Sequence, residues 1–73
     1  MRARNSNSVV AANVRTLREK LGWSQEMLGE KAGLHRTYIG AIERSEENIT
    51  LNTLDRIAVA LHVAADELVR PGK

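Results

Sequence analysis

The apolar and polar positions between Gln25 and Arg44 follow the pattern of two short helices joined at Gly33. Helices that cross at a tight turn need apolar or small residues where they touch, and six positions meet this need: Leu28, Gly29, Ala32, Leu34, Ile39 and Ile42. Gly33 lies where the backbone must become left-handed, which residues with a Cβ do only at a cost. The pattern predicts a helix-turn-helix over residues 24–44, although an ordinary hairpin of two helices in a small bundle has the same requirements.

The remaining pattern indicates further helices, because the chain lacks the alternation of period two that is typical of strands. A first helix is predicted from apolar residues that recur at i, i+4, i+7 and i+11, which are Val10, Val14, Leu17 and Leu21. Ser8 is the expected N-cap of this helix, and Gly22 is the residue expected to end it.

The four later helix starts share one device, in which an apolar residue before the helix is followed five positions later by another. The pairs are Trp23 with Leu28, Leu34 with Ile39, Ile49 with Leu54, and Val63 with Leu68. Ser24 and Thr50 are good residues for the capping positions, whereas His35 and Ala64 are poorer ones. Together these signals predict an all-α fold with helices over residues 9–21, 24–32, 36–44, 51–61 and 65–69.

The 73 residues are enough for one domain, which we expect over residues 9–70 after a flexible basic arm at residues 1–8. The net charge is only +2, but residues 1–45 carry eight Lys or Arg against four Asp or Glu, while residues 46–73 carry three against five. A basic first part is expected of a surface that binds a polyanion such as nucleic acid. The alternative is that this asymmetry is ordinary scatter of surface charge, because the charges are few.

Several classes of function lack their usual signals in this sequence. There is no cysteine, and the two histidines, His35 and His62, fall on different predicted helices without a suggestive carboxylate pair or a phosphate-binding glycine loop. The longest apolar run, residues 57–61, is too short to span a bilayer or to form the core of a secretory signal. We therefore expect a cytoplasmic protein that is not an enzyme, needs no cofactor, and binds neither metal nor membrane.

Three stretches of the chain read LREKLGWSQEMLGEKAGL, HRTYIGAIER and NITLNTLDRIAVALHVAADEL. In order and spacing they resemble the Cro/CI (XRE)-type helix-turn-helix family. The resemblance covers about residues 10–69 and implies a five-helix lambda-repressor-like DNA-binding domain. A small chain that reads HRTYIGAIER followed by NITL is similar to controller proteins of restriction-modification systems, a match that many small repressors share. The resemblance also places Arg18 and Glu43 where the family has a partly buried ion pair between the first helix and the recognition helix.

In this fold the second helix of the motif, residues 36–44, lies in the major groove of DNA with its first turn nearest the bases. Arg36 is the first candidate for base readout, because a guanidinium donates two hydrogen bonds to O6 and N7 of guanine, worth about 1–3 kcal/mol of discrimination. Thr37 is the second candidate, through its methyl group on a thymine or its hydroxyl on a phosphate. Gly40 and Ala41 have no side-chain groups that could hydrogen-bond to a base, so we expect them to let the helix approach the DNA closely.

Contacts to the DNA backbone are expected around these two residues. Ser24 and Gln25 stand at a helix start, where backbone N–H groups and the helix dipole favour a phosphate. Further candidates for backbone contact are Tyr38, Arg44, Asn48 and Arg15. In the basic arm, Arg2 and Arg4 either reach a groove or remain solvated. Acidic residues at 46 and 47, where the family commonly has basic ones, should weaken binding that ignores sequence.

One such helix covers only a few base pairs, so we expect a homodimer on two half-sites about one helical turn apart. The expected interface is the fifth helix together with the end of the fourth, through Leu61, Val63, Leu68 and Val69. The alternative is that these residues close the core of the monomer.

These expectations combine into one leading function. The chain is expected to be a transcriptional regulator that binds an inverted repeat in double-stranded DNA near its own promoter, and the resemblance implies control of restriction-modification genes. The acid-rich second half is a candidate contact for RNA polymerase. The alternatives are a phage-type repressor and a protein-binding module of the antitoxin kind.

Overall fold

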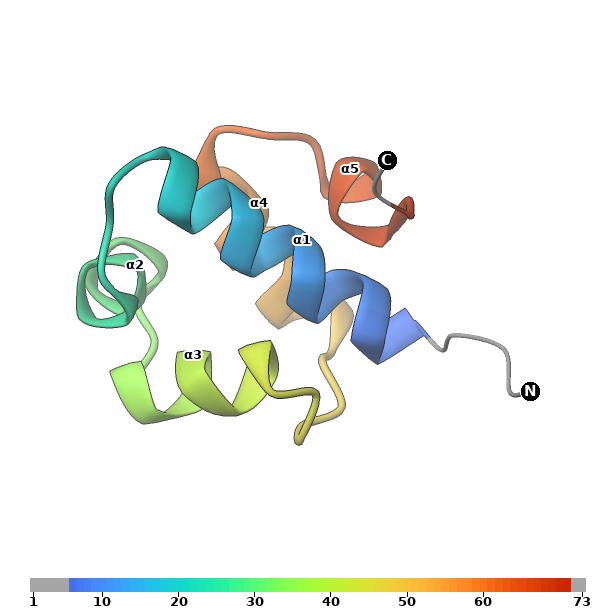
Figure 1. The fold of residues 1–73 in the computed structure, drawn as a ribbon, viewed down its shortest axis with the longest axis horizontal. Helices are drawn as coiled ribbons and strands as arrows, with labels where there is room; N and C mark the ends of the chain where they lie inside the picture. Colours follow the sequence, from blue (N-terminus) through green and yellow to red (C-terminus); the bar gives the residue numbers. More distant parts are fainter. Residues whose placement is uncertain (1–5, 72–73) are drawn as a thin grey trace.

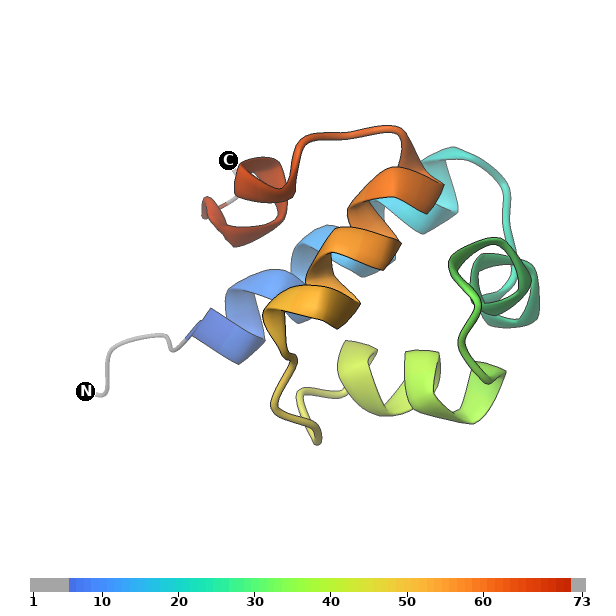
Figure 2. The ribbon, with the colours of Figure 1, turned by 180° about the vertical axis from the view of Figure 1, so that it is seen from behind.

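The computed structural model describes residues 6–71, which contain five helices and no strand. The helices are α1 (Ser6–Lys20), α2 (Gln25–Ala32), α3 (Arg36–Glu43), α4 (Leu51–Leu61) and α5 (Ala65–Val69). Figure 1 shows α1 crossing the front of the molecule, with α4 behind it, α2 at one end, α3 along the lower edge and α5 beside α1. Figure 2 shows the same arrangement from behind. The predicted all-α, five-helix fold is confirmed.

The start of α1 differs from the prediction. The helix begins at Ser6, so Ser8 lies within its first turn and the expectation that Ser8 is the N-cap is wrong. The reason is tertiary packing, because the residues that follow are all buried and hold the first turns of the helix against the core: Val9, Val10 and Ala11. Residues 6–8, which the sequence assigns to the arm, are helical, and Arg2 and Arg4 lie outside the described residues.

The end of α1 also corrects one predicted core position. Leu21 follows the last helical residue and remains 44% exposed, so it is not part of the buried stripe that includes Val14. The chain turns away here because Gly22 adopts a φ of +74° and the Trp23 N–H donates to the Arg18 carbonyl at 3.1 Å. The helix therefore ends near Gly22, as the sequence predicts, but its buried apolar stripe is one turn shorter than predicted.

Side chains cap the starts of α2, α3 and α4. The hydroxyls of Ser24 and Thr50 each accept a hydrogen bond from the backbone N–H three residues further on, at 3.0 and 3.1 Å. His35 also caps its helix, because its Nδ1 accepts the N–H of Thr37 at 3.0 Å, so the sequence underrates this residue. The starts of these three helices, and that of α5, which has no side-chain cap, lie within one residue of the predicted positions.

The core is aliphatic and receives side chains from all five helices. Its largest fully buried side chains are Leu28, Ile39, Ile57, Leu68 and Val14. The first members of the predicted apolar pairs are half-buried and pack against this core: Trp23, Leu34, Ile49 and Val63.

Two residues predicted for a dimer interface belong instead to the core of the single chain. Leu61 is 4% exposed and Leu68 is 0% exposed, so neither is available to a partner, and the prediction is corrected for both. The physical reason is that α5 folds back against α1 and α4 and needs buried apolar side chains to hold it there. Val63 and Val69 retain exposed surface.

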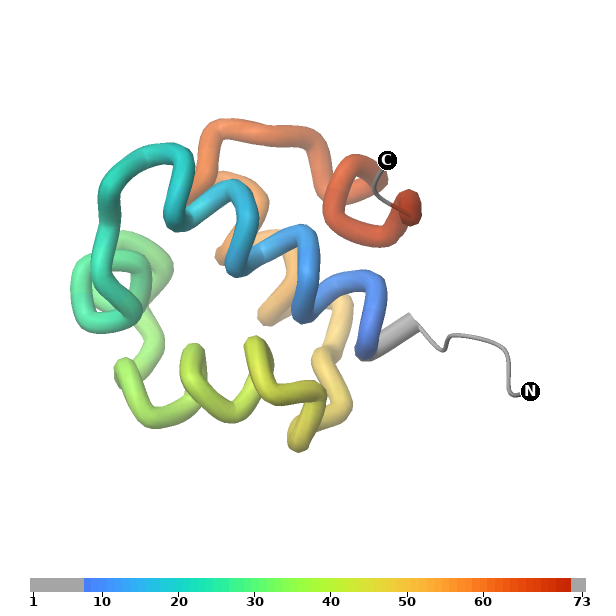
Figure 3. Tube along the Cα trace, in the orientation of Figure 1, coloured from blue at the N-terminus to red at the C-terminus, as the bar shows by residue number. Residues whose placement is uncertain are grey.

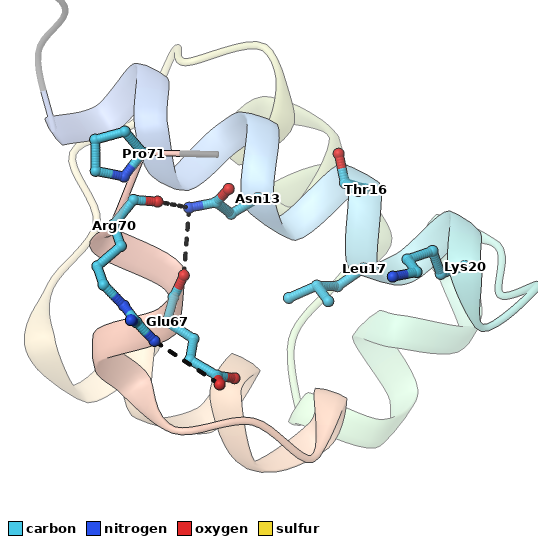
Figure 4. Close-up of a pocket in the computed structure, with 7 residues that line it drawn as sticks. All are labelled: Asn13, Thr16, Leu17, Lys20, Glu67, Arg70 and Pro71. Atoms are coloured by element: carbon cyan, nitrogen blue, oxygen red, sulfur yellow. Dashed lines mark hydrogen bonds and ion pairs between the residues drawn. The ribbon is translucent and has the colours of Figure 1, made fainter. Parts of the chain in front are cut away.

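Hydrogen bonds from Asn13 also hold α5 against α1. The Asn13 Nδ2 donates to the carbonyl oxygens of Leu68 and Arg70 at 2.8 and 2.7 Å, at the end of α5. Figure 4 shows Asn13 facing this end of the helix beside a hollow of about 390 Å³ that is lined by Asn13, Thr16, Leu17, Lys20, Glu67, Arg70 and Pro71. A helix of only five residues is therefore positioned by polar contacts as well as by apolar burial.

Two further findings apply to residues 6–71. None of their helices is both long enough and apolar enough to cross a membrane. Nor do these residues contain a group of three or more His, Cys, Asp or Glu side chains that could hold a metal ion.

Candidate nucleic-acid interface

The turn between α2 and α3 fixes how the two helices cross, and Figure 3 traces its path. Gly33 has a φ of +73°, in the left-handed region, and the Leu34 N–H donates to the Gly29 carbonyl at 2.8 Å. A Cβ at Gly29 would collide with the backbone oxygen of Leu34. The glycine therefore lets α2 lie unusually close to the turn, which sets the direction in which α3 leaves it.

One side of α3 is buried and the other is exposed. Ile39 and Ile42 point into the core, whereas Arg36, Thr37 and Arg44 are exposed. Figures 1 and 2 both show α3 along an edge of the molecule with α1 and α4 on its inner side. The helix thus presents a polar face at the edge of the protein, which is the arrangement that insertion into a groove requires.

A largely buried ion pair holds α3 to α1. Arg18 Nε and Nη2 donate to Glu43 Oε2 and Oε1 at 2.6 and 3.0 Å. The two side chains are only 11% and 4% exposed. The hydrogen bonds to Glu43 raise the pKa of Arg18 above its ordinary value, although burial acts in the opposite direction. The structure thus brings together the two residues that the family resemblance pairs.

Gln25 extends this ion pair to α2. Its Nε2 donates to Glu43 Oε1 at 3.1 Å, so this carboxylate receives hydrogen bonds from α1 and from the first residue of α2. A Cβ at Gly40 would lie 3.2 Å from Gln25 Oε1, so the glycine gives the Gln25 side chain room. Gln25, which the sequence assigns to a phosphate contact because it stands at a helix start, therefore has a half-buried side chain that positions α3. No spacing in the sequence signals this contact between separate helices.

Two exposed arginines, Arg36 at the start of α3 and Arg44 at its C-cap, each lie beside a carboxylate. Arg36 Nη1 is 3.5 Å from Glu26 Oε1 on α2, and these side chains are 61% and 62% exposed. Arg44 Nε is 3.1 Å from Glu46 Oε2, and this hydrogen bond raises the pKa of Arg44 above its ordinary value. Sequence reasoning missed Glu26, because its partner lies on the next helix and the turn alone brings the two together.

The other candidates for backbone contact lie in different settings. Ser24 is exposed at the start of α2, and its hydroxyl caps that helix. Tyr38 is half-buried against the core, while Asn48 is exposed in the segment between α3 and α4. Arg15 is exposed on α1 and its Nε donates to Glu19 at 3.2 Å. Of the candidates for backbone contact, Tyr38 lies within α3 and Arg44 is its C-cap residue.

Comparisons with known proteins return helix-turn-helix proteins. The family model described as Helix-turn-helix matches residues 14–68. A hypothetical transcription factor of Neisseria meningitidis serogroup B is 47% identical over 64 residues, which are 88% of this chain and 60% of that protein. Control protein C.SmaI of Serratia marcescens is 49% identical over 61 residues, 84% of this chain and 73% of that protein. The crystal structure of the restriction-modification controller protein C.AhdI from Aeromonas hydrophila matches with a TM-score of 0.82 and 35% identity, covering 85% of this chain and 94% of that one.

Proposed function

The chain belongs to the helix-turn-helix (XRE-type) family, a class of DNA-binding transcription regulators and not of enzymes, and from this premise we propose that it is a sequence-specific regulator. It acts as a homodimer on an inverted-repeat operator near its own promoter. Similarity to a control protein and to a restriction-modification controller protein supports control of restriction-modification genes as well. Because the chain spans only about 60% of the length of its Neisseria relative, these activities are inferred for the region that is shared. Action on cellular DNA implies a cytoplasmic location.

The exposed face of α3 is the observation that carries the proposal. Arg36 and Thr37 occupy its first turn, which in a helix-turn-helix lies nearest the base edges. Ile39 is buried behind this face, and Glu43 is held by Arg18 and Gln25. A helix fixed in this way presents its outer side chains at defined positions, as direct readout of bases requires.

We assign base readout to Arg36 and Thr37, with a guanine as the partner of the Arg36 guanidinium. Contacts to the DNA backbone are assigned to the exposed or half-exposed groups nearby, which are Ser24, Tyr38, Arg44, Asn48 and Arg15. Gln25 contributes through its backbone N–H at the start of α2, since its side chain serves Glu43.

The homodimer is proposed to form through α5 and the end of α4. Val69 is 45% exposed and Val63 is half-buried, so both offer apolar surface to a second copy. The interface is smaller than the sequence suggests, because Leu61 and Leu68 are used by the core. A two-fold dimer matches the symmetry of an inverted repeat and supplies a second recognition helix.

A contact with RNA polymerase is proposed for the second half of the chain. Asp55, Asp66 and Glu67 are exposed there, although Arg70 lies within ion-pair distance of the last two. Exposed carboxylates of this kind are suited to a basic patch on another protein. At a promoter where this surface meets the polymerase, the protein would activate transcription.

The proposal is tested by fluorescence anisotropy on duplex DNA from upstream of the protein's own gene, against a shuffled duplex of the same composition near physiological salt. We expect tight binding to the native duplex, with two chains per duplex by sedimentation. Arg36→Ala should cost about 1–3 kcal/mol on the native duplex and little on the shuffled one.

Arg15→Ala is the matched control, because it removes an exposed arginine assigned to backbone contact. It should weaken binding to both duplexes alike. It should also reduce the slope of log affinity against log salt concentration by about 1, because one phosphate contact is lost. Equal, weak binding of the unmodified protein to both duplexes would contradict sequence-specific regulation at this site.

A further inference from the structure

We propose that Glu26 is a specificity-determining residue that positions Arg36 for guanine and discourages its binding to phosphate. The inference rests on the proposed function, because it assigns a role to the neighbour of the proposed reading residue. Glu26 lies in the first turn of α2, whose start is capped by Ser24 and whose next turn is buried through Leu28. Its carboxylate is therefore carried by a firmly placed helix.

The geometry of the contact leaves Arg36 able to read a base. Glu26 Oε1 lies 3.5 Å from Nη1 of Arg36. The Nε and Nη2 groups form the other edge of the guanidinium and donate in parallel, as the same two atoms of Arg18 do toward Glu43. A guanine offers O6 and N7 as a matching pair of acceptors in the major groove. One arginine can thus hold Glu26 and a guanine at the same time, through different N–H groups.

The charge near Arg36 distinguishes a base from a phosphate. Glu26 and Glu30 line the same hollow of about 290 Å³ with Leu34, His35 and Arg36. A phosphate that approaches the Arg36 guanidinium meets the Glu26 carboxylate, which lies 3.5 Å from Nη1, and is repelled, whereas the edge of a guanine carries no net charge. Since binding that ignores sequence depends on neutralising phosphates, Glu26 should weaken that mode more than it weakens base readout.

The second cation on the exposed face of α3 provides a contrast. In Arg44 the carboxylate partner Glu46 lies at Nε, at 3.1 Å, and so occupies part of the two-donor edge. In Arg36 the Nε and Nη2 edge remains available to donate hydrogen bonds to DNA, because the carboxylate lies at Nη1. The two-donor edge is therefore open in Arg36 and partly occupied in Arg44, which favours Arg36 for base readout.

Three variants separate the position of the Glu26 carboxylate from its charge. Glu26→Gln removes the charge, Glu26→Asp keeps the charge but shortens its reach to Arg36, and Glu30→Gln removes a charge one turn further along the same hollow. Each is measured on the native and the shuffled duplex over a range of salt, and circular dichroism checks the fold of each variant.

Glu26→Gln should strengthen binding to the shuffled duplex and lower the ratio of native to shuffled affinity by about fivefold, the scale of one exposed ion pair. Glu26→Asp should lower the ratio without strengthening shuffled binding. Glu30→Gln should change both affinities alike. In an Arg36→Ala background, Glu26→Gln should leave the ratio unchanged, because the two residues act as one unit.

The outcomes keep this inference apart from the proposed function. If the unmodified protein does not prefer the native duplex, the proposed function fails. If it does prefer that duplex, but Glu26→Gln and Glu30→Gln alter the ratio equally, or Glu26→Asp leaves it unaltered, then only the charge matters and the positioning role is overturned.

Discussion

Two arginine–glutamate pairs link α3 to its neighbours, and they differ chiefly in burial. Arg18 and Glu43 are 11% and 4% exposed and share two hydrogen bonds, whereas Arg36 and Glu26 are 61% and 62% exposed and meet at one nitrogen, 3.5 Å away. Water competes for the exposed pair but hardly for the buried one. The buried pair therefore fixes the inner side of α3, whereas the exposed pair leaves Arg36 on the outer side accessible to DNA.

The largest expected effect comes from removing one member of the buried pair. Glu43→Ala leaves the Arg18 guanidinium mostly buried without its carboxylate, which should lower the free energy of unfolding by about 3–5 kcal/mol. Urea denaturation followed by circular dichroism measures this change. A cost of that size is comparable to the whole stability of a small domain, so the variant should be partly unfolded at 25 °C.

The control replaces both charges with apolar side chains, as Arg18→Met with Glu43→Leu. This double variant should recover most of the stability, because no buried charge remains unpaired. If Glu43→Ala alone lowers the free energy of unfolding by less than about 1 kcal/mol, the pair behaves like a surface pair. The difference in burial between the two pairs would then not explain a difference in stability.

An intermediate effect is expected at Gln25, which touches the buried pair from its half-buried side. Gln25→Ala removes one hydrogen bond to a charged carboxylate and should lower the free energy of unfolding by about 1–2 kcal/mol. It should also weaken binding to native and shuffled duplexes together, since α3 becomes less firmly held. Gln25→Met, which keeps the volume but not the amide, should behave in the same way. Stability equal to that of the unmodified protein would show that Glu43 does not need this donor.

The fold was largely predictable because its signals are local. Caps at Ser24 and Thr50, the left-handed turn at Gly33 and the spacing of apolar residues all act within a few positions of the chain. The predictions are wrong where packing between segments that are far apart in the sequence determines the structure. Burial against other helices starts α1 before Ser8, and the docking of α5 draws Leu68 into the core.

The candidate site was predictable to a smaller extent, for the same reason. The exposure of Arg36 follows from the helical period of α3, and the pairing of Arg18 with Glu43 follows only from a family resemblance. The contacts of Glu26 and Gln25 cross between helices, so they depend on how closely α2 approaches α3 and on the missing Cβ atoms at Gly29 and Gly40. These distances are set by tertiary packing, and no periodicity in the sequence predicts them.

The smallest expected effect is that of Glu26→Gln on stability. Both partners of this pair are exposed, so the ion pair and the favourable place of Glu26 at the start of α2 should together contribute less than about 1 kcal/mol. Urea denaturation at low salt measures this loss, which should nearly vanish near 1 M salt, where the screening length is about 3 Å. Glu30→Gln serves as the matched loss of charge on the same helix. A loss above about 2 kcal/mol would instead make Glu26 a structural residue like Glu43, and changes in DNA preference would then reflect a displaced α3.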